Sequence, residues 1–383
     1  MTADNTHSSP VRVGFVMHVM QVAGAEVLVT QVIKKLARQI EPTVFCLDAI
    51  GELGERLQAE GVPVVCLDRK PGLDLAVAKR LAAEVADRKI QVLHAHQYTP
   101  FFYTALARLR YRSKARVLFT EHGRHYPDIV SPKRRWINRL VLQRYADITT
   151  ACCDFSTEAL QHVEGFPRAV TLVNGVDIDT LPGRGNAEQQ HALRERLGLD
   201  LDRPYAACIA RFHSVKDHRT LLRAWQHVQQ ALPAARLLLV GDGPERKACE
   251  QFAEELGVAS SVEFWGIRKD VGDILRAIDV FTLTSVSEAA SLTLLEAMAS
   301  ECPAVLTAVG GNAEHVTEGK HGYLAPRGDD QQIAKRLEQL LTDSATAKKM
   351  GKAARQRVLQ DFELDDVIAE YANLYSQLAS KAK

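Results

Sequence analysis

The sequence of 383 residues has few aromatic side chains, no excess of charge of either sign and no long apolar run. Aromatic residues make up 6% of the chain, and 48 basic side chains against 47 acidic ones leave a formal net charge of +1. Proteins that bind nucleic acid rely on positive grooves and aromatic stacking, so this composition excludes nucleic acid as the main partner. No segment approaches the about 18 consecutive apolar residues of a membrane-spanning helix, and none is expected.

Cysteine use also narrows the class of protein. The seven cysteines include no C-x-x-C pair, and several lie within apolar runs, so we predict reduced thiols in a cytoplasmic protein. Cys152 and Cys153 are adjacent, a spacing that forms disulfides poorly, and we expect them in the core or at a strand edge. The polar start MTADNTHSSP precedes no apolar core, so no signal peptide is expected.

The sequence does contain the composition of an ordinary globular protein, with 46% hydrophobic and 25% charged residues. Its length suggests two domains or one large one, at roughly 150 residues per domain. Apolar runs rich in β-branched residues alternate with amphipathic stretches along the chain, which predicts βαβ units on parallel sheets. The strand candidates are 11–17, 43–47, 62–67, 90–94, 116–120, 147–151 and 169–173, followed by 205–210, 236–240, 262–265, 280–284 and 304–309.

The alternation pauses at LPGRGNAEQQ, residues 181–190, which has the composition of an interdomain connection. We therefore predict two doubly wound α/β domains that face each other across a cleft. Ligands of such sheets bind beyond the carboxyl ends of the strands, so functional residues are expected directly after strands. The predicted parts are a first domain over 1–180, a linker over 181–200, a second domain over 201–360, and a C-terminal helix over 361–383 that packs back on the first domain.

The most informative segment is SVSEAASLTLLEAMAS, residues 285–300. Glu288 falls in the loop after a strand candidate, and Glu296 lies two turns into a helix whose other face is apolar. The unpaired amides of such a helix N-terminus form a phosphate site, and a carboxylate beside it is suited to sugar hydroxyls. These donors are the amides of Ala289, Ala290, Ser291 and Leu292. The alternative is a capping glutamate and an unrelated surface glutamate.

Two cations follow the first strand candidate of the second half. In IARFHSVKDH, Arg211 and Lys216 lie five residues apart on one loop. Arginine can bind phosphate bidentately and lysine supplies a point charge, so the pair suits a diphosphate, although isolated residues of this kind more often belong to a solvated loop. Gly241 opens the tight turn GDGP after the next strand candidate. This signal is weak alone, and the chain lacks the G-x-G-x-x-G and acidic residue of a dinucleotide site.

Together these motifs resemble the donor half of the retaining glycosyltransferases of family 4, also called group 1, which have the GT-B fold of two Rossmann-like domains. Glu288 and Glu296 correspond to the family's Glu-x7-Glu motif, and Arg211 and Lys216 to its Arg/Lys pair. The other segments that resemble the family, in its order, are AGAE at 23–26, TEHG at 120–123, NGVD at 174–177, VGDGPE at 240–245, the strand and loop 262–266, and GGNAEHV at 310–316.

The resemblance implies a retaining hexosyltransferase that uses a UDP- or GDP-sugar and needs neither a metal nor a cofactor. Arg211, Lys216 and loop amides, including that of Gly24, would stabilise the charge that develops on the diphosphate leaving group. In this family the acceptor attacks from the leaving-group face, so no protein nucleophile is expected.

The resemblance also implies roles for the remaining motif residues. Glu296 would hold the ribose hydroxyls, the backbone that ends in Gly266 would receive the base, and the turn at Gly241 would line the donor site. Glu288 would bind the donor sugar or its near phosphate, and His122 would contact the donor sugar from the opposite wall.

Two positions depart from the family pattern. Ala23 and Ala289 stand where the family usually has glycine, and either alanine would be strained if its loop needed a positive φ. This departure leaves open a module that binds a nucleotide sugar without activity. A GT-B phosphorylase or a sugar-nucleotide epimerase is the alternative among enzymes, and an epimerase would act without a second substrate.

Two pairs have the look of metal ligands. Asp177 and Asp179 form a D-x-D at a domain junction without further acidic ligands, so no metal site is predicted there. His94 and His96 point to the same side of a strand end, but a zinc site needs a third ligand, and none is apparent. We expect these histidines to line the acceptor cleft.

Positive charge is concentrated over residues 108–144, where eleven basic and two acidic residues give a net charge of +9. In KRRWINRLVLQR the cations are interleaved with apolar residues, a pattern typical of a helix that rests on an anionic membrane surface. We predict this contact for Lys133, Arg134, Arg135 and Trp136. The predicted acceptor is then a lipid-linked or cell-surface glycan precursor at the inner face of a bacterial cytoplasmic membrane. The alternative is a solvated helix with its apolar side in the core, and a soluble acceptor.

Overall fold

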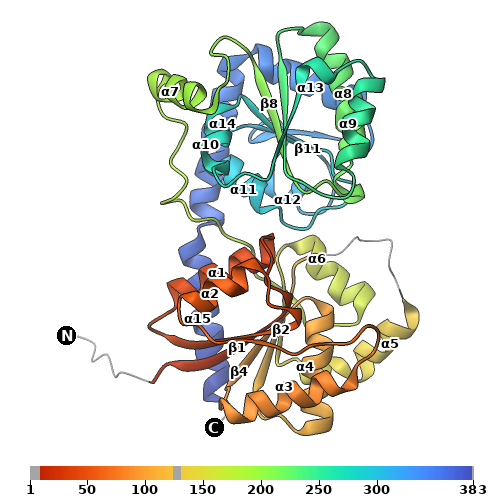
Figure 1. Cartoon of the computed structure of the whole chain (residues 1–383), viewed down its shortest axis with the longest axis vertical. Helices are drawn as coiled ribbons and strands as arrows, with labels where there is room; N and C mark the ends of the chain where they lie inside the picture. Colours follow the sequence, from red (N-terminus) through yellow and green to blue (C-terminus); the bar gives the residue numbers. More distant parts are fainter. Residues whose placement is uncertain (1–8, 124–130, 382–383) are drawn as a thin grey trace, which may run out of the picture. The chain divides into compact units, whose positions relative to one another are not determined.

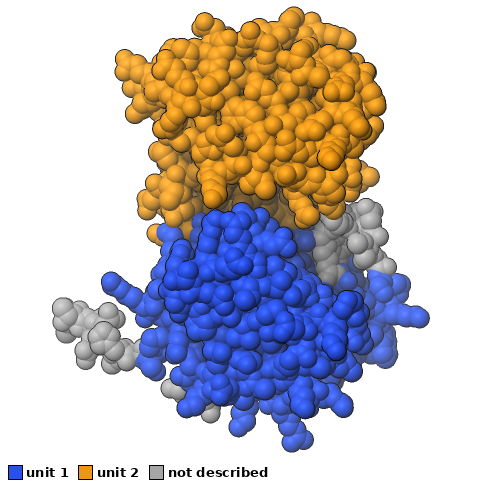
Figure 2. All heavy atoms as spheres, viewed as in Figure 1, with its two compact units in different colours: residues 1–173, 366–383 blue, residues 174–365 orange. Residues whose placement is uncertain are grey.

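The chain folds around two parallel β-sheets, one in each of two compact units (Figure 1). The computed structural model describes residues 9–123 and 131–381. The first unit consists of Met1–Val173 and Asp366–Lys383, and the second of Asn174–Asp365 (Figure 2). The predicted fold class, α/β with two doubly wound parallel sheets, is confirmed.

The first sheet has seven strands in the order β3-β2-β1-β4-β5-β6-β7, and every pairing is parallel. Its central strands are mainly buried, and all five residues of β4, including two histidines, are buried, as expected for a sheet covered on both faces. The strands are β1 (Val11–Val19), β2 (Ile40–Ala49), β3 (Val64–Cys66), β4 (Val92–His96), β5 (Arg116–Glu121), β6 (Ile148–Ala151) and β7 (Val170–Thr171).

Helices from both ends of the chain cover this sheet. The last helix, α15 (Leu364–Ser380), buries Tyr371 and Tyr375, and the Tyr375 hydroxyl lies 2.7 Å from Nδ1 of His94 in β4. The other helices of the unit are α1 (Gly24–Lys35), α2 (Glu52–Ala59), α3 (Leu75–Asp87), α4 (Tyr98–Tyr111), α5 (Pro132–Leu140) and α6 (Asp154–Ala159).

The second sheet has six parallel strands in the order β10-β9-β8-β11-β12-β13. The sequence predicts five of them and misses β13, because its four residues, GYLA, begin with a glycine and follow a polar loop. The strands are β8 (Tyr205–Ile209), β9 (Arg236–Val240), β10 (Val262–Gly266), β11 (Val280–Leu283), β12 (Ala304–Thr307) and β13 (Gly322–Ala325).

Two layers of helices flank the second sheet, with α8, α9 and α13 on one side and α10, α11 and α14 on the other (Figure 1). α8 directs its apolar face inward, where Trp225 is fully buried and its indole N–H donates to Ser261 Oγ at 3.1 Å. The helices are α7 (Ala187–Leu197), α8 (His218–Ala231), α9 (Arg246–Glu255), α10 (Val271–Ala277), α11 (Leu292–Ala299), α12 (Asn312–His315), α13 (Asp330–Thr342) and α14 (Ser344–Asp361).

Residues 181–200, expected as a linker, contain helix α7. Asn186 and Gln189 form a capping box at its start, and Gly198 ends it with a φ of 73°. Arg194 ties α7 to the second unit through its 2.8 Å contact with Asp279. The sequence does not indicate this helix, because the residues before it have the composition of a loop and its capping residues are also common in turns.

Each sheet reverses its strand order at one point, between β1 and β4 in the first unit and between β8 and β11 in the second. The loops after the two strands that flank such a point diverge to opposite faces of the sheet. They leave a crevice at the carboxyl edge, where ligands of doubly wound sheets bind. The predicted site residues therefore have to be tested at these two edges.

Candidate functional site

The edge between β8 and β11 brings together two of the residues that the motifs single out. Lys216 ends a short 3₁₀ turn after β8, and Glu288 lies in the loop after β11. The Lys216 ammonium nitrogen lies 2.8 and 2.7 Å from the two carboxylate oxygens of Glu288, and Ser285 Oγ donates to the same carboxylate at 2.8 Å. The side chains are 20% and 10% exposed, so the pair is accessible from one side only.

Backbone contacts hold these two loops against each other. The N–H of Val286 donates to the carbonyl of Val215 at 2.8 Å, and the Thr284 hydroxyl donates to the carbonyl of Asp217 at 3.0 Å. An ammonium group carries three N–H donors, and Glu288 offers two acceptors to that of Lys216. One donor remains for a ligand, in a position that is fixed before the ligand arrives.

The helix after Glu288 adds backbone donors to this edge. α11 begins at Leu292, and its N-cap Ser291 accepts a hydrogen bond from the N–H of Leu294 at 3.3 Å. The first amides of a helix have no intrahelical partner, and the helix dipole makes this end favourable for an anion. Lys216 is held in contact with Glu288, in the loop that leads into this helix. The edge therefore combines an ammonium group with free backbone amides, which is the chemistry of a phosphate site.

The two alanines that depart from the family pattern are not strained. Ala23 precedes α1 with a φ of −147°, and Ala289 is not among the described non-glycine residues that have a positive φ. The position in this loop that requires glycine is Gly311, where the backbone lies so close to Ala289 that a Cβ would be 1.7 Å from its carbonyl oxygen. Gly311 also donates its N–H to the carbonyl of Glu288 at 3.1 Å, which braces the loop.

Glu296 lies in the second turn of α11. Burial raises the pKa of its carboxyl group above the ordinary value, to about 7. A buried carboxylate without a charge partner is costly, and hydroxyl donors from a ligand would remove that cost. The position and the raised pKa suit a carboxylate that accepts hydrogen bonds from a diol.

We expect the pKa of Glu296 to couple stability and ligand binding to pH. Its folded-state pKa lies above the unfolded value, so its contribution to stability is present below about pH 4.5 and is lost as pH rises through 7. Glu296→Gln should therefore gain up to about 3 kcal/mol of stability relative to the wild type by pH 8. If the ionised form binds ribose hydroxyls, nucleotide binding should tighten from pH 6 to 8 in the wild type and lose that dependence in the variant.

Thermal unfolding and titration calorimetry with UDP, GDP and ADP measure both effects. Glu254→Gln is the matched control, because this glutamate is exposed in the same unit. A pH dependence of binding that persists in Glu296→Gln would remove Glu296 from the ribose site.

Glycines bring the loops after β8, β9 and β10 close together. Gly241 has a φ of 136°, and a Cβ there would lie 2.2 Å from the carbonyl oxygen of Ala210. The N–H of Gly241 donates at 2.7 Å to the carbonyl of Gly266, whose φ is 67°. The loops after β8 and β9 and the end of β10 are therefore in contact through their backbones. A side chain at Gly241 would collide with the backbone of Ala210, and one at Gly266 would be strained by the positive φ.

Arg211, the other half of the predicted clamp, does not join the Lys216–Glu288 pair. Its side chain is exposed at the end of β8 and makes no hydrogen bond or ion pair within the part of the chain that the structure describes. Because Glu288 offsets the charge of Lys216, Arg211 is the cation of this loop whose charge no contact within the described residues offsets. An exposed guanidinium is suited to bind a diphosphate bidentately.

In the first unit, Gly24 and two histidines lie at the corresponding edge. Gly24 is the exposed first residue of α1, which follows β1 after the loop 20–23, and its amide is one of the unpaired donors of that helix. His96 ends β4, and His122 follows β5. Nδ1 of His96 lies 2.7 Å from Nε2 of His122, and burial lowers the pKa of His122 to about 4, so both groups are neutral at pH 7.

The expectation that His94 and His96 line an open cleft is wrong for His94 and incomplete for His96. His94 is fully buried between Tyr375 and Thr120, with contacts of 2.7 Å to each. His96 is 1% exposed and reaches the surface only through its contact with His122. The alternation of side chains in β4 puts both on the same face, but the sequence does not reveal that α15 covers that face.

Helix α5 exposes its apolar residues, contrary to the alternative in which they belong to the core. Trp136, Ile137 and Leu140 are 65%, 44% and 40% exposed, and they recur at the three- and four-residue spacing of one helix face. Lys133 and Arg135 are exposed on the same helix. None of the described helices is long and apolar enough to cross a bilayer.

Arg134 does not belong to this exposed surface. Its guanidinium forms an ion pair with Glu164, a residue whose side chain is 6% exposed, and lies 3.8 Å above the ring of Tyr98. The sequence predicts that Arg134 contacts a membrane, but its side chain instead contacts other parts of the protein. The sequence does not indicate that Glu164 is its partner, because the two residues are far apart along the chain. Arg124, in the same basic segment, lies outside the described residues.

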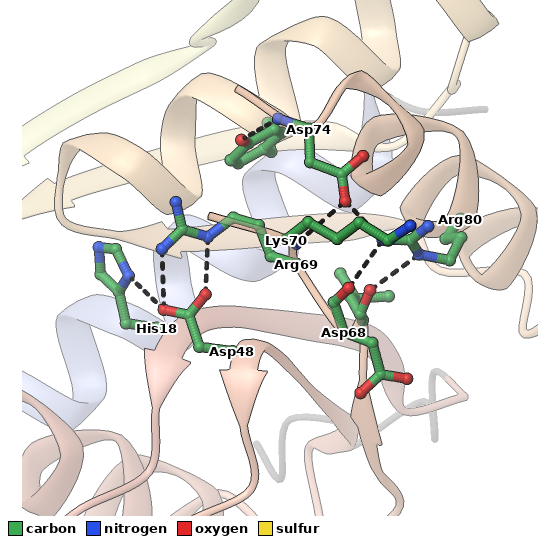
Figure 3. Close-up of polar contacts among 9 residues, drawn as sticks. His18, Asp48, Asp68, Arg69, Lys70, Asp74 and Arg80 are labelled. Carbon is green, nitrogen blue, oxygen red and sulfur yellow. Dashed lines mark hydrogen bonds and ion pairs between the residues drawn. The ribbon is translucent and has the colours of Figure 1, made fainter. Parts of the chain in front are cut away.

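A polar network at the carboxyl ends of β1, β2 and β3 is not predicted by any motif. Figure 3 shows the side chains of His18 and Arg69 converging on Asp48. Arg69 contacts both carboxylate oxygens, at 2.6 and 3.0 Å, and Nδ1 of His18 lies 3.2 Å from one of them. The hydrogen bond from Arg69 lowers the pKa of Asp48. His18 and Asp48 lie near the ends of β1 and β2, and Arg69 lies in the loop after β3. Because the three residues are far apart in sequence, only the rule that parallel strands end at one edge of the sheet could have indicated this network.

The structure gives the D-x-D pair a local role. Asp177 Oδ1 accepts a hydrogen bond from the N–H of Asp179 at 3.2 Å, which is a turn within the chain. Over residues 9–123 and 131–381, no group of three or more metal-ligating side chains could hold an ion. Cys152 and Cys153 are buried free thiols, as expected for core residues.

Comparison with known proteins gives two family matches, one in each half of the chain. Residues 22–180 match the model described as Glycosyltransferase Family 4, and residues 189–357 match Glycosyl transferases group 1. Together they contain the two edges described above.

The N-acetyl-alpha-D-glucosaminyl L-malate synthase of Bacillus anthracis is 29% identical over 308 residues, which are 80% of this chain and 79% of that protein. The GDP-mannose-dependent alpha-(1-6)-phosphatidylinositol monomannoside mannosyltransferase of Mycolicibacterium smegmatis is 28% identical over 312 residues, 76% of this chain and 80% of that one. Among solved structures, Anabaena Alr3699/HepE in complex with UDP and glucose superposes with a TM-score of 0.84 at 21% identity, over 96% of this chain and 99% of that chain. This likeness shows the GT-B fold.

Proposed function

Because this chain belongs to the group 1 glycosyltransferases, we propose that it transfers a hexose from a UDP- or GDP-sugar to a glycan or lipid-linked acceptor with retention at the anomeric carbon. The observation that carries the donor assignment is the Lys216–Glu288 pair beside the N-terminus of α11. An oriented ammonium donor and backbone amides at one edge suit a diphosphate, and the nearby Glu296 suits a ribose diol.

The leaving group gains negative charge as the glycosidic bond breaks. The free donor of Lys216, the guanidinium of Arg211 and the first amides of α11 are the groups that would stabilise this charge. Glu288 would orient Lys216 and accept a hydroxyl of the donor sugar, while His122 would donate to that sugar. We assign no protein nucleophile, so the acceptor would attack from the face that the diphosphate leaves.

Retention is tested by the anomeric configuration of the product. The enzyme is incubated with an α-linked nucleotide sugar and an acceptor, and the anomeric configuration of the new glycoside is read from its NMR coupling constants. An α-linked product agrees with the proposal, and a β-linked product overturns retention without affecting the transfer itself.

We expect turnover to survive removal of divalent metal ions. Lys216 and Arg211 supply the positive charge that a metal would otherwise provide to the diphosphate. Activity measured in excess EDTA should stay close to that of the untreated enzyme. A loss that manganese or magnesium restores would contradict metal independence, and Asp177 and Asp179 would then be the first ligands to test.

We propose a lipid-linked acceptor, with the protein held on an anionic membrane surface through α5. The exposed apolar stripe of Trp136, Ile137 and Leu140 beside Lys133 and Arg135 supports this, because basic residues and apolar side chains on one exposed helix suit an anionic lipid surface. One relative is named for a phosphatidylinositol-based acceptor and another for malate, so the choice rests on α5. The location that fits is the inner face of a bacterial cytoplasmic membrane.

A further inference from the structure

His96 and His122 form a pair at the edge of the first sheet, and the two ring nitrogens of His96 have different surroundings. Strands β4 and β5 are paired in register, with His96 opposite Thr120, and His122 follows two residues later. The two rings are nearly parallel, 13° apart, with centroids at 5.0 Å. Nδ1 of His96 faces Nε2 of His122, while Nε2 of His96 is buried and has no hydrogen-bond partner in the described part of the chain.

The neighbouring His94 cannot supply that missing partner. Its two nitrogens are taken by Tyr375 and Thr120, at 2.7 Å each. Both nitrogens of His94 therefore have a hydroxyl partner, whichever of them carries the ring proton. His94 is therefore a neutral ring whose single proton is already used.

Only one proton can lie between His96 and His122, and two arrangements are possible. If Nε2–H of His122 donates, His96 carries its own proton on the buried Nε2, which leaves an N–H without an acceptor. If Nδ1–H of His96 donates, its buried Nε2 is a bare acceptor. Buried donors without a partner are rarer in proteins than acceptors that are not fully satisfied, so the second arrangement is favoured. Burial lowers the pKa of both rings and keeps them neutral.

We propose that His96 is a positioning residue that fixes the tautomer and the orientation of His122. His96 donates from Nδ1 to Nε2 of His122, and this contact confines the proton of His122 to its own Nδ1. That Nδ1–H has no partner within the described residues and is the donor that His122 presents to a ligand. The ligand would be a hydroxyl oxygen of the transferred sugar, and this last step alone rests on the proposed function.

The tautomer is measured by NMR on the full chain, independently of activity. Long-range proton–nitrogen spectra of protein with nitrogen-15-labelled histidine distinguish Nδ1–H from Nε2–H rings, and the His122 signals are assigned with His122→Asn. We expect an Nδ1–H ring for His122 in the wild type. An Nε2–H ring would overturn the proposal.

Two substitutions separate a positioning role from a packing role. His96→Leu removes the donor, and His122 should then sample both tautomers. His96→Asn keeps an N–H donor near the original Nδ1 and should restore the single tautomer. In His96→Leu we expect kcat to fall about 10–100-fold, as when a histidine loses the partner that orients it, with KM for the donor changed less.

Three results would contradict the role of His96: a fixed Nδ1–H ring in His96→Leu, equal losses of kcat in the leucine and asparagine variants, or an equal loss in His162→Asn, an exposed histidine of the same unit. If His96→Leu fails to fold, the spectra of the wild type and of His96→Asn test the proposal. An Nδ1–H ring of His122 in both supports it, and an Nε2–H ring in either contradicts it. If no sugar transfer is found at all, the spectra still test the tautomer while the proposed function fails separately.

Discussion

Lys216→Ala is expected to lose about 2–4 kcal/mol of transition-state stabilisation, a fall of roughly 30- to 1,000-fold in kcat/KM. Lys216 is held 2.7–2.8 Å from both oxygens of Glu288, which leaves one N–H donor for a diphosphate that gains charge. The substitution by alanine removes the donor that would stabilise the negative charge on the diphosphate in the transition state. Steady-state kinetics with the preferred nucleotide sugar measure the effect, and near-normal turnover would remove Lys216 from the diphosphate site.

A second variant separates chemistry from structure. Lys216→Ala also leaves Glu288, which is 10% exposed, without its charge partner, and an unpaired half-buried carboxylate destabilises the loop. Lys216→Ala combined with Glu288→Gln removes this charge. If the double variant regains thermal stability but turns over more slowly than Glu288→Gln alone, Lys216 acts on the substrate. Lys320→Ala, at an exposed lysine of the same unit, should keep normal turnover and stability.

Neutralising the exposed cations of α5 is expected to weaken binding to anionic vesicles by about 3 kcal/mol, or roughly 100-fold, since each near-surface cation contributes about 1 kcal/mol. The variant is Lys133→Gln, Arg135→Gln and Arg139→Gln, three exposed positions on this helix. Arg134 stays unchanged, because losing its ion pair with Glu164 would leave that carboxylate buried without a charge partner and destabilise the region. Co-sedimentation with phosphatidylglycerol vesicles at low and high salt gives the measurement.

The matched control removes the same charge from another part of the basic segment. Arg110→Gln, Arg112→Gln and Lys114→Gln change three exposed cations near the end of α4. If both triple variants bind vesicles equally well, net charge rather than α5 governs the contact. If the wild type fails to bind at low salt, the lipid-linked acceptor gives way to a soluble one.

The sequence predicts the fold through its strands, because buried parallel strands are rich in apolar residues. The run at 236–240 corresponds to β9, and the run at 205–210 to β8 with one residue added. β13 is missed because four residues beginning with glycine resemble a loop. Helix α7 is missed because its capping residues, Asn186 and Gln189, are equally typical of turns.

The sequence indicates contacts between residues that follow strands at the same switch point, and it does not indicate contacts that depend on how helices pack. Lys216 and Glu288 are 72 residues apart, yet both follow strands that flank the same switch point, so their meeting could be anticipated. The pairing of Arg134 with Glu164 depends on how α5 packs, which no local pattern encodes. The same holds for α15, whose Tyr375 covers His94 across 281 residues of sequence.

The central claim is that the carboxyl edge of the second sheet binds a nucleotide diphosphate sugar and breaks its glycosidic bond. It is tested most directly by incubating the protein with UDP-, GDP- and ADP-sugars and measuring the release of free nucleoside diphosphate. We predict slow release from at least one UDP- or GDP-sugar by the wild type, and a fall of at least about 30-fold in Lys216→Ala, the lower end of the expected loss. No release from any donor by a folded protein, or equal release by Lys216→Ala, would contradict the account.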